Sequence, residues 1–181
     1  RRLLEQLIPN YQGPMVIDAD GLNLISEYQM FDRIKQRRAP TVLTPHPGEM
    51  SRLLRKPKEA VLADPVGSIR EAVELTGAVV LLKGAATLIG GPDHPVYFNH
   101  YPNDGMATAG SGDVLAGMIG GLLGQRLEPF SSTLLAVYLH SLAGDFAAKN
   151  VGHRSMTASD ISKNIGPAFQ SLQTAREAHP S

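Results

Sequence analysis

A glycine-rich stretch from Asn103 to Gly124, NDGMATAGSGDVLAGMIGGLLG, carries the clearest chemical signal in this chain. Small and turn-forming residues from Ala107 to Gly112 lead into an apolar run at Val114, and that run predicts a helix. The free backbone N–H groups in the first turn of a helix bind anions, and glycine lets a ligand come close to the backbone. The pattern therefore indicates a binding site for phosphate groups, such as those of a nucleotide.

One acidic residue, Asp113, lies at the start of the predicted helix, where the helix dipole is most positive. This position makes Asp113 a candidate catalytic group beside bound phosphate. A second interpretation stays open, in which Ser111 caps the helix and Asp113 only supplies a favourable charge in its first turn.

The same helix carries further glycines at three- and four-residue spacing, so that they share one face. They are Gly117, Gly120, Gly121 and Gly124. Each glycine costs about 0.5–1 kcal/mol relative to alanine in a helix. We therefore predict that this face packs closely against the backbone of a neighbouring element.

Further polar residues follow short apolar runs that read as buried strands at residues 14–18, 41–44 and 78–82. They are Asp18, Asp20, Asn23, His46, Glu49 and Lys83. Open α/β sheets bind ligands at the carboxyl ends of their strands, so these residues are candidates for one crevice. The structural alternatives are that Asp20 caps a helix, that Glu49 is a dipole partner and that Lys83 extends to solvent.

His46 lies between two prolines, which hold it in a stiff extended turn. A site or surface position is therefore favoured over a core position. His140 and Asp145 instead lie on a predicted helix rich in apolar residues, which favours a structural role for both.

Strands alternate with helices along the whole chain. Helices are predicted at residues 1–9, 21–30, 50–54, 65–76, 114–124, 131–149 and 159–172, a hairpin at 87–91 and 96–98, and a charged loop at 55–64. This order predicts an α/β fold with a mostly parallel sheet.

Composition excludes several classes of function. Lys+Arg and Asp+Glu both number 17, so the overall charge gives no reason to expect nucleic acid or an anionic membrane as a partner. No apolar run reaches the roughly 18 residues of a membrane span. The absence of cysteine excludes disulfides and thiolate metal sites and fits a reducing compartment, so we expect a cytoplasmic protein.

Five motifs, in this order, resemble the ADP/ATP-dependent NAD(P)H-hydrate dehydratases, a ribokinase-like family. They are VIDADGLNLI (16–25), TVLTPHPGEMSRLL (41–54), VVLLKGAATLI (79–89), NDGMATAGSGDVLAGMIGGLL (103–123) and AVYLHSLAGDFAA (136–148). The resemblance implies a three-layer ribokinase-like fold. It also implies an enzyme that repairs hydrated NADH and NADPH by removing water, with ADP leaving AMP and phosphate or ATP leaving ADP and phosphate.

The resemblance also implies roles for individual residues. Asp113 is the catalytic base and contacts the hydrated nicotinamide, His46 binds the substrate, and Glu49 binds Mg²⁺ through water. The nucleotide-binding residues are Lys83, Gly84, Ala85, Ala86, Thr87, Met106, Ala107, Thr108, Ala109, Gly110, Ser111 and Gly112. His46 stands where related kinases have asparagine, which favours dehydratase over a sugar or vitamin kinase.

The resemblance further implies that residues 1–181 are the carboxyl-terminal portion of a single domain whose early strands are absent. We expect this portion to self-associate and to show little activity when expressed alone. A homo-oligomer and an upstream NAD(P)H-hydrate epimerase domain or partner are also expected. Two alternatives remain, a ribokinase-like small-molecule kinase and a non-catalytic nucleotide-binding fragment.

Overall fold

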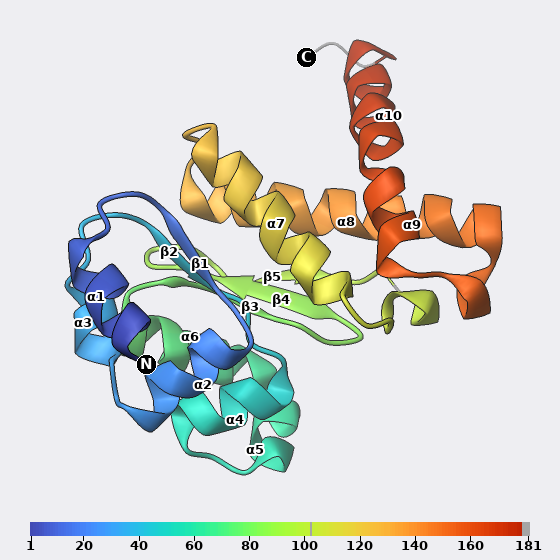
Figure 1. Cartoon of the computed structure of the whole chain (residues 1–181). Coiled ribbons are helices and arrows are strands. Elements are labelled where there is room, and N and C mark those ends of the chain that lie inside the picture. Colours follow the sequence, from blue (N-terminus) through green and yellow to red (C-terminus); the bar gives the residue numbers. More distant parts are fainter. Residues whose placement is uncertain (102, 179–181) are drawn as a thin grey trace.

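The computed structural model describes residues 1–101 and 103–178, and these form a sheet of five strands in the order β1-β2-β3-β4-β5 (Figure 1). The strands are β1 (Met15–Ile17), β2 (Thr41–Leu43), β3 (Val79–Leu82), β4 (Thr87–Gly90) and β5 (Tyr97–Asn99). Strands β1, β2 and β3 are parallel, and β4 runs antiparallel to both β3 and β5. The predicted mostly parallel sheet and the predicted hairpin are therefore confirmed.

Helices fill the connections and the end of the chain. The first six are α1 (Arg2–Asn10), α2 (Asp20–Glu27), α3 (Phe31–Lys35), α4 (Pro47–Leu54), α5 (Lys58–Ala63) and α6 (Pro65–Thr76). The last four are α7 (Ser111–Gly124), α8 (Pro129–Val151), α9 (Ala158–Lys163) and α10 (Ile165–Ala178), with short 3₁₀ turns η1 (Asp104–Met106) and η2 (His153–Ser155). Within the described ranges, none of these helices combines the length and apolarity that crossing a membrane requires.

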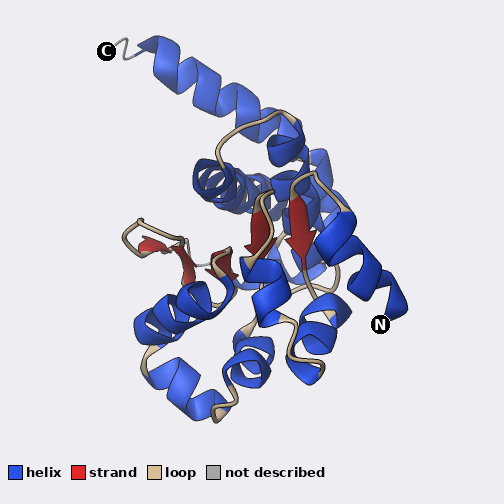
Figure 2. Cartoon of the chain, turned by 90° about the vertical axis from the view of Figure 1, so that its left-hand side faces the viewer, coloured by secondary structure: helices blue, strands red, loops and turns tan. Residues whose placement is uncertain are grey.

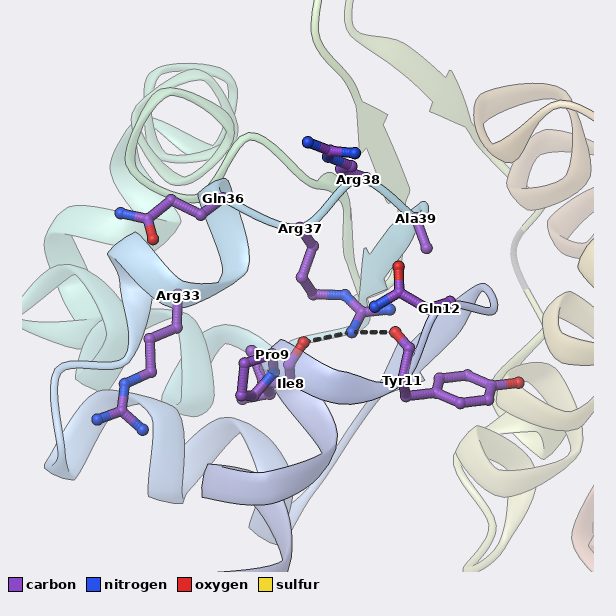
Figure 3. Close-up of a pocket in the computed structure, with 9 residues that line it drawn as sticks. All are labelled: Ile8, Pro9, Tyr11, Gln12, Arg33, Gln36, Arg37, Arg38 and Ala39. Carbon is purple, nitrogen blue, oxygen red and sulfur yellow. Dashed lines mark hydrogen bonds between the residues drawn. The ribbon is translucent and has the colours of Figure 1, made fainter.

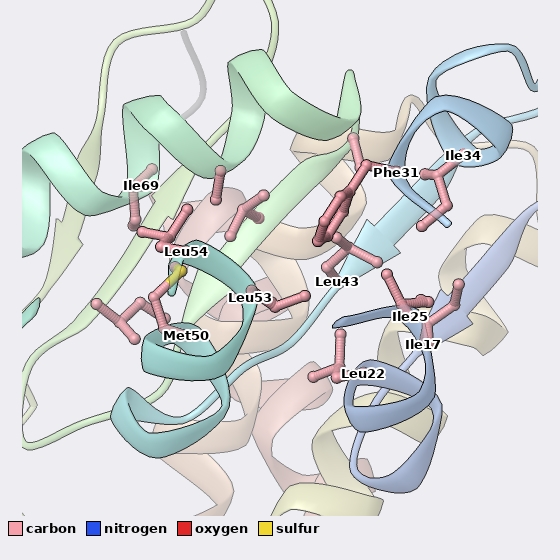
Figure 4. Packing of buried hydrophobic residues seen from close by; sticks show 14 of the residues in the cluster. Ile17, Leu22, Ile25, Phe31, Ile34, Leu43, Met50, Leu53, Leu54 and Ile69 are labelled. Carbon is pink, nitrogen blue, oxygen red and sulfur yellow. The ribbon is translucent and has the colours of Figure 1, made fainter. Parts of the chain in front are cut away.

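Alternation along the strands divides the core into two layers. Ile17, Leu43 and Val80 point into a cluster with helices α1 to α6, part of which Figure 4 shows. Their neighbours Val42 and Val79 point to the other face, where α7 and α8 cover the sheet. The sheet therefore lies between two helical layers, with α1 to α6 on one side and α7 and α8 on the other (Figures 1 and 2). This is the predicted three-layer arrangement.

Several predicted boundaries differ from the structure for local reasons. Residues 55–64 were expected as a loop, but they contain α5, because Val61 is fully buried and gives that segment a packed face. Helix α1 continues through Pro9 to Asn10. The predicted helix 159–172 is two helices, α9 and α10, separated at Asn164.

The glycine face of α7 contradicts its predicted role. A Cβ added at Gly117, Gly120, Gly121 or Gly124 would find no heavy atom of the described chain within 4 Å. Helix α7 packs on the sheet through its opposite side, which includes Leu115 and Ile119. The prediction of close backbone packing on this face is therefore wrong for the described elements.

Candidate functional site

Polar residues from three parallel strands meet at the carboxyl edge of the sheet. Asp18 directly follows β1 and Lys83 directly follows β3, and the Lys83 Nζ lies 2.7 Å from Asp18 Oδ1. Glu49 lies on the helix that follows β2, with its Oε2 4.0 Å from Lys83 Nζ. The side chains of Lys83 and Asp18 are 23% and 15% exposed, so the pair is mostly shielded but open to a ligand.

His46 and Glu49 hold each other at the start of α4. The His46 Nδ1 accepts hydrogen bonds from the N–H groups of Gly48 and Glu49 at 3.0 and 3.2 Å. In return, Glu49 Oε2 accepts from the His46 N–H at 2.8 Å, which makes a reciprocal capping box. This box starts α4 at Pro47, three residues before the predicted start. It leaves the His46 ring half exposed at the edge of the site, where substrate contact stays a prediction.

The start of α7 leaves backbone N–H groups without hydrogen-bond partners among the described residues. Gly110 is the N-cap residue in a left-handed conformation with φ 84°, and Ser111 is the first helical residue without a side-chain cap. The interpretation in which Ser111 caps the helix is therefore wrong. The N–H groups of Gly112 and Asp113 have no hydrogen-bond partner among the described residues. Such free N–H groups at a helix start are the usual donors to a bound phosphate.

Gly112 joins this helix start to the strand ends. A Cβ at this position would lie 3.5 Å from Lys83 Nζ and 3.8 Å from Asp18 Oδ2. The two free N–H groups, the ammonium and the carboxylate therefore surround one small space. The sequence prediction that the glycine-rich stretch and Lys83 share a site is consistent with this geometry.

Asp113 stands beside this space with a free carboxylate. Its side chain is exposed, and within the described ranges it makes no hydrogen bond or ion pair. Its Oδ2 lies 3.9 Å from the position of a Cβ on Gly110. An unpaired carboxylate next to phosphate-binding N–H groups is available to accept a proton, so its role as a base stays a prediction that the geometry permits.

The other predicted nucleotide-binding residues occupy two loops. Gly84, Ala85 and Ala86 form the turn between β3 and β4, and Thr87 is the first residue of β4. Met106 ends η1, and its side chain fills the space above Gly144 on α8, where a Cβ would collide with its sulfur. The Met106 side chain therefore packs against α8, and its N–H already donates to the Asn103 carbonyl oxygen at 3.0 Å, so a nucleotide contact from Met106 stays a prediction. Contacts from Ala107, Thr108 and Ala109 stay predictions.

The balance of charges in the site is relevant to whether a metal ion could bind there together with a nucleotide. Two carboxylates, Asp18 and Glu49, lie 2.7 and 4.0 Å from the Lys83 ammonium, and a third, Asp113, lies in the first turn of α7, so an anionic nucleotide needs more positive charge than Lys83 supplies. In the part of the chain that the structure describes, no group of three or more histidine, aspartate or glutamate side chains could hold a metal by itself. Mg²⁺ typically uses one or two carboxylates together with waters and substrate phosphates. The buried Glu49 carboxylate fits that mode.

Sequence reasoning missed the partner of Lys83. Asp18 was noted only as a polar residue after a strand, because 65 positions separate it from Lys83 and no local pattern joins them. Asp20 is the first residue of α2 and makes no side-chain cap, so the capping interpretation for Asp20 is wrong.

Two residues on α8, His140 and Asp145, hold the segment from Asn103 to Ser111 by hydrogen bonds, as predicted for a structural role. His140 Nε2 lies 3.1 Å from the Ser111 carbonyl oxygen, and Asp145 Oδ1 accepts a hydrogen bond from Asn103 Nδ2 at 3.0 Å. Burial lowers the pKa of His140 from 6.5 to about 4, so the ring is neutral near pH 7 and Nε2–H donates to that carbonyl.

A second candidate surface lies at the amino ends of the parallel strands, opposite the site described above, and its role is structural. A cavity of about 380 Å³ there is lined by Ile8, Pro9, Tyr11, Gln12, Arg33, Gln36, Arg37, Arg38 and Ala39. Figure 3 shows that the guanidinium groups of Arg33 and Arg38 point away from each other, while Arg37 bonds to backbone oxygens. The three arginines do not converge on a common point, so this cavity is not an anion site.

The comparisons with known proteins identify the family of the chain. The family described as NAD(P)H-hydrate dehydratase matches residues 1–167. The chain is 46% identical over 159 residues to a bifunctional NAD(P)H-hydrate repair enzyme of Moorella thermoacetica, covering 88% of this chain and 30% of the relative. It is 38% identical over 160 residues to an ADP-dependent (S)-NAD(P)H-hydrate dehydratase of Neisseria meningitidis, covering 88% and 53%. The chain thus spans about half of the latter relative and less than a third of the former.

Solved structures show the same fold. An ADP/ATP-dependent NAD(P)H-hydrate dehydratase from Bacillus subtilis, co-crystallised with ATP and Mg²⁺, superposes with a TM-score of 0.81 at 26% identity, covering 94% of this chain and 60% of that one. A ribokinase-like superfamily protein from Enterococcus faecalis gives a TM-score of 0.78 at 30% identity, covering 94% and 57%. The ribokinase-like fold predicted from the motifs is confirmed.

Proposed function

The chain belongs to the NAD(P)H-hydrate dehydratase family, and from this premise we propose that it carries the nucleotide site and the catalytic base of an ADP/ATP-dependent dehydratase acting on hydrated NADH and NADPH. The observation that carries the proposal is the start of α7. There, the N–H groups of Gly112 and Asp113 have no hydrogen-bond partner among the described residues, Lys83 Nζ lies 3.5 Å from the Cβ position of Gly112, and the Asp113 carboxylate is unpaired within the same ranges. Phosphate and a proton acceptor can therefore meet at one point.

The chemistry follows from the poor leaving ability of the substrate hydroxyl. Asp113 accepts the hydroxyl proton while the oxygen attacks the terminal phosphorus of the nucleotide, and AMP leaves from ADP, or ADP from ATP. The N–H groups at the start of α7, with Lys83, stabilise the charge on the transferring phosphoryl group. The ring nitrogen lone pair then expels phosphate from carbon. Loss of a proton from the adjacent ring carbon restores the dihydronicotinamide.

Two residues complete the proposed site. His46, held by its capping box, contacts the substrate from the rim, and Glu49 holds Mg²⁺ through water. When bound, Mg²⁺ neutralises phosphate charge in a site that holds three carboxylates and one ammonium. The Bacillus subtilis dehydratase crystallised with ATP and Mg²⁺ supports this assignment by similarity.

The wider context is also part of the proposal. Residues 1–181 are the carboxyl-terminal portion of a longer ribokinase-like domain, since the matched solved chain of the dehydratase is covered only to 60%. The name of the Moorella thermoacetica relative, a bifunctional repair enzyme, supports a second activity in the same protein or in a partner. A cytoplasmic location and a homo-oligomer stay predictions.

Product analysis tests the proposed function. The natural protein that contains this chain is incubated with hydrated NADH, Mg²⁺ and either ADP or ATP. We expect NADH to return with one phosphate per nucleotide consumed, and the preferred nucleotide to be read from AMP or ADP formed. A stable phosphorylated substrate without NADH would instead identify a small-molecule kinase. Nucleotide binding without any turnover would identify a non-catalytic nucleotide-binding protein.

A further inference from the structure

Lys83 has one strong partner, and that partner is Asp18. The Nζ–Oδ1 distance of 2.7 Å is that of a charge-assisted hydrogen bond. Glu49 is 4.0 Å from the same ammonium, which is too long for a hydrogen bond. A lysine ammonium has three N–H donors, so two of them remain for a ligand when Asp18 takes one.

The backbone beside Asp18 is strained in a way that fixes its carboxylate. Ala19 has φ 48° and ψ −121°, a combination that residues with a Cβ rarely adopt. The Ala19 N–H donates to Asp18 Oδ1 at 2.9 Å, so the oxygen that binds Lys83 is also held by the strained peptide. A carboxylate anchored by its own backbone is a rigid support for the ammonium.

The held ammonium lies where phosphate is expected. The Cβ position of Gly112 is 3.5 Å from Lys83 Nζ and 3.8 Å from Asp18 Oδ2, and Gly112 contributes one of the free N–H groups of α7. Lysine has a flexible four-carbon side chain, and ordering it costs free energy when a ligand binds. Fixing the ammonium in advance removes part of that cost.

We propose that Asp18 is a positioning residue of the nucleotide site, whose carboxylate holds the Lys83 ammonium against Gly112 with two N–H groups directed at the terminal phosphate. This inference rests on the proposed function, since it assumes that a nucleotide binds at the start of α7.

The sign of one measurement separates positioning from simple electrostatics. Asp18→Asn removes a negative charge next to the phosphate site, so charge alone predicts tighter ADP binding. Positioning predicts weaker binding, because the amide holds the ammonium less firmly. We expect calorimetry on the natural protein to show ADP affinity reduced about fivefold or more, with the thermal midpoint nearly unchanged. Equal or tighter binding overturns the proposal.

A double-mutant cycle tests whether Asp18 acts through Lys83. We expect Lys83→Met to weaken ADP binding about tenfold, and Asp18→Asn to add less than twofold in the Lys83→Met protein. Additive effects of the two substitutions would show that Asp18 acts independently and would overturn the proposal. Asp20→Asn is the matched control. Asp20 is exposed and lies two positions from Asp18 in the chain, and the substitution removes the same charge from a residue that has no lysine partner among the described residues.

Three further outcomes of these experiments also have a defined meaning. If Asp18→Asn fails to fold, Asp18→Glu keeps the charge and moves the carboxylate by one methylene. Positioning then predicts weaker ADP binding, and unchanged binding overturns it. If the wild-type protein binds ADP but returns no NADH, the proposed function fails while the affinity cycle still tests Asp18. If the wild-type protein binds neither ADP nor ATP, both the proposed function and the role of Asp18 are wrong.

Discussion

Two partly buried cations lie at opposite ends of the same parallel strands, and their surroundings differ completely. At the amino end, Arg37 donates to the carbonyl oxygens of Ile8, Tyr11 and Gly13 at 2.6, 3.0 and 2.8 Å. Its Nε also donates to Thr41 Oγ1 at 3.0 Å. At the carboxyl end, Lys83 bonds to one carboxylate and keeps two donors free.

The difference separates a structural cation, Arg37, from Lys83, the cation of the proposed nucleotide site. Arg37 has five N–H donors, of which four are bonded to neutral oxygens, so it fastens the loop before β1 to the loop before β2. Burial lowers the pKa of Arg37 from its usual value, yet the guanidinium stays charged. Lys83 makes few contacts and stands beside free N–H groups. Changes at the amino end should therefore act on stability, and changes at the carboxyl end should act on ligands and turnover.

Asp113→Asn should have the largest effect and should fall wholly on turnover. The amide keeps the size of the side chain but cannot accept the substrate proton, so kcat should fall about 10²–10⁴-fold. ADP affinity should stay within a few-fold, and the thermal midpoint should not move, because Asp113 has no bonded partner among the described residues. Steady-state kinetics and calorimetry on one preparation check this. Unchanged turnover would show that another group is the base.

Arg37→Met should have the opposite effect, a loss of stability without a direct loss of turnover. It leaves three carbonyl oxygens without their donor, and we expect the free energy of unfolding to fall by about 3–4 kcal/mol. Arg37→Lys is the control, since it keeps the charge but cannot reach three carbonyls and should be nearly as destabilising. Denaturant unfolding measures both. A large loss of kcat at temperatures where the variant remains folded would contradict the inference that the amino end of the strands affects stability and the carboxyl end affects turnover.

A substitution at His140 tests whether residues near the carboxyl ends of the strands also affect the stability of the fold. Its pKa is about 4 in the folded protein and near 6.5 when unfolded, so the unfolded state binds the proton first as pH falls. The stabilisation of the folded state by neutral His140 should be complete above pH 6.5. It should be lost progressively as the pH falls to 4, which lowers the free energy of unfolding by about 2–3 kcal/mol. His140→Gln keeps a donor for the Ser111 carbonyl and should remove this part of the pH dependence. Parallel stability curves for the two proteins would contradict the assignment.

Lys83→Met should have the smallest effect on the property that it is used to test, which is ADP affinity. The substitution keeps the aliphatic stem and deletes the charge. ADP affinity should fall about tenfold and depend less on salt, because the substitution removes a charge from beside the phosphate. Calorimetry at two ionic strengths checks this. A salt dependence identical to that of wild type would show that the ammonium does not face phosphate.

The sequence predicted the layers of the fold well, for a physical reason. Strand positions such as Val42 and Leu43 are apolar on both sides, and that pattern is sufficient to indicate a sheet covered on both faces. The loop at 55–64 was predicted wrongly because its charged residues conceal Val61, whose burial depends on α4 and α6. Local composition does not report such tertiary packing.

The site was predicted in part. The glycine-rich start of α7 and Lys83 were predicted to share a site because their chemistry is local, and the structure places Lys83 Nζ 3.5 Å from the Cβ position of Gly112. The Asp18 partner was not found, because the pairing joins distant residues through the register of β1, β2 and β3. His46 was assigned to a site, but its capping box with Glu49 required the geometry of α4.

Helix α7 meets the described chain on one side only, and this affects how it moves. Its four outward glycines add backbone freedom that alanine would not, and no side chain covers them. Helix α8, 23 residues long, packs against α7, α9 and α10. We therefore expect amide hydrogen exchange to be faster along α7 than along α8. The helix that carries the proposed phosphate-binding N–H groups would then be more mobile than the helix that packs beside it.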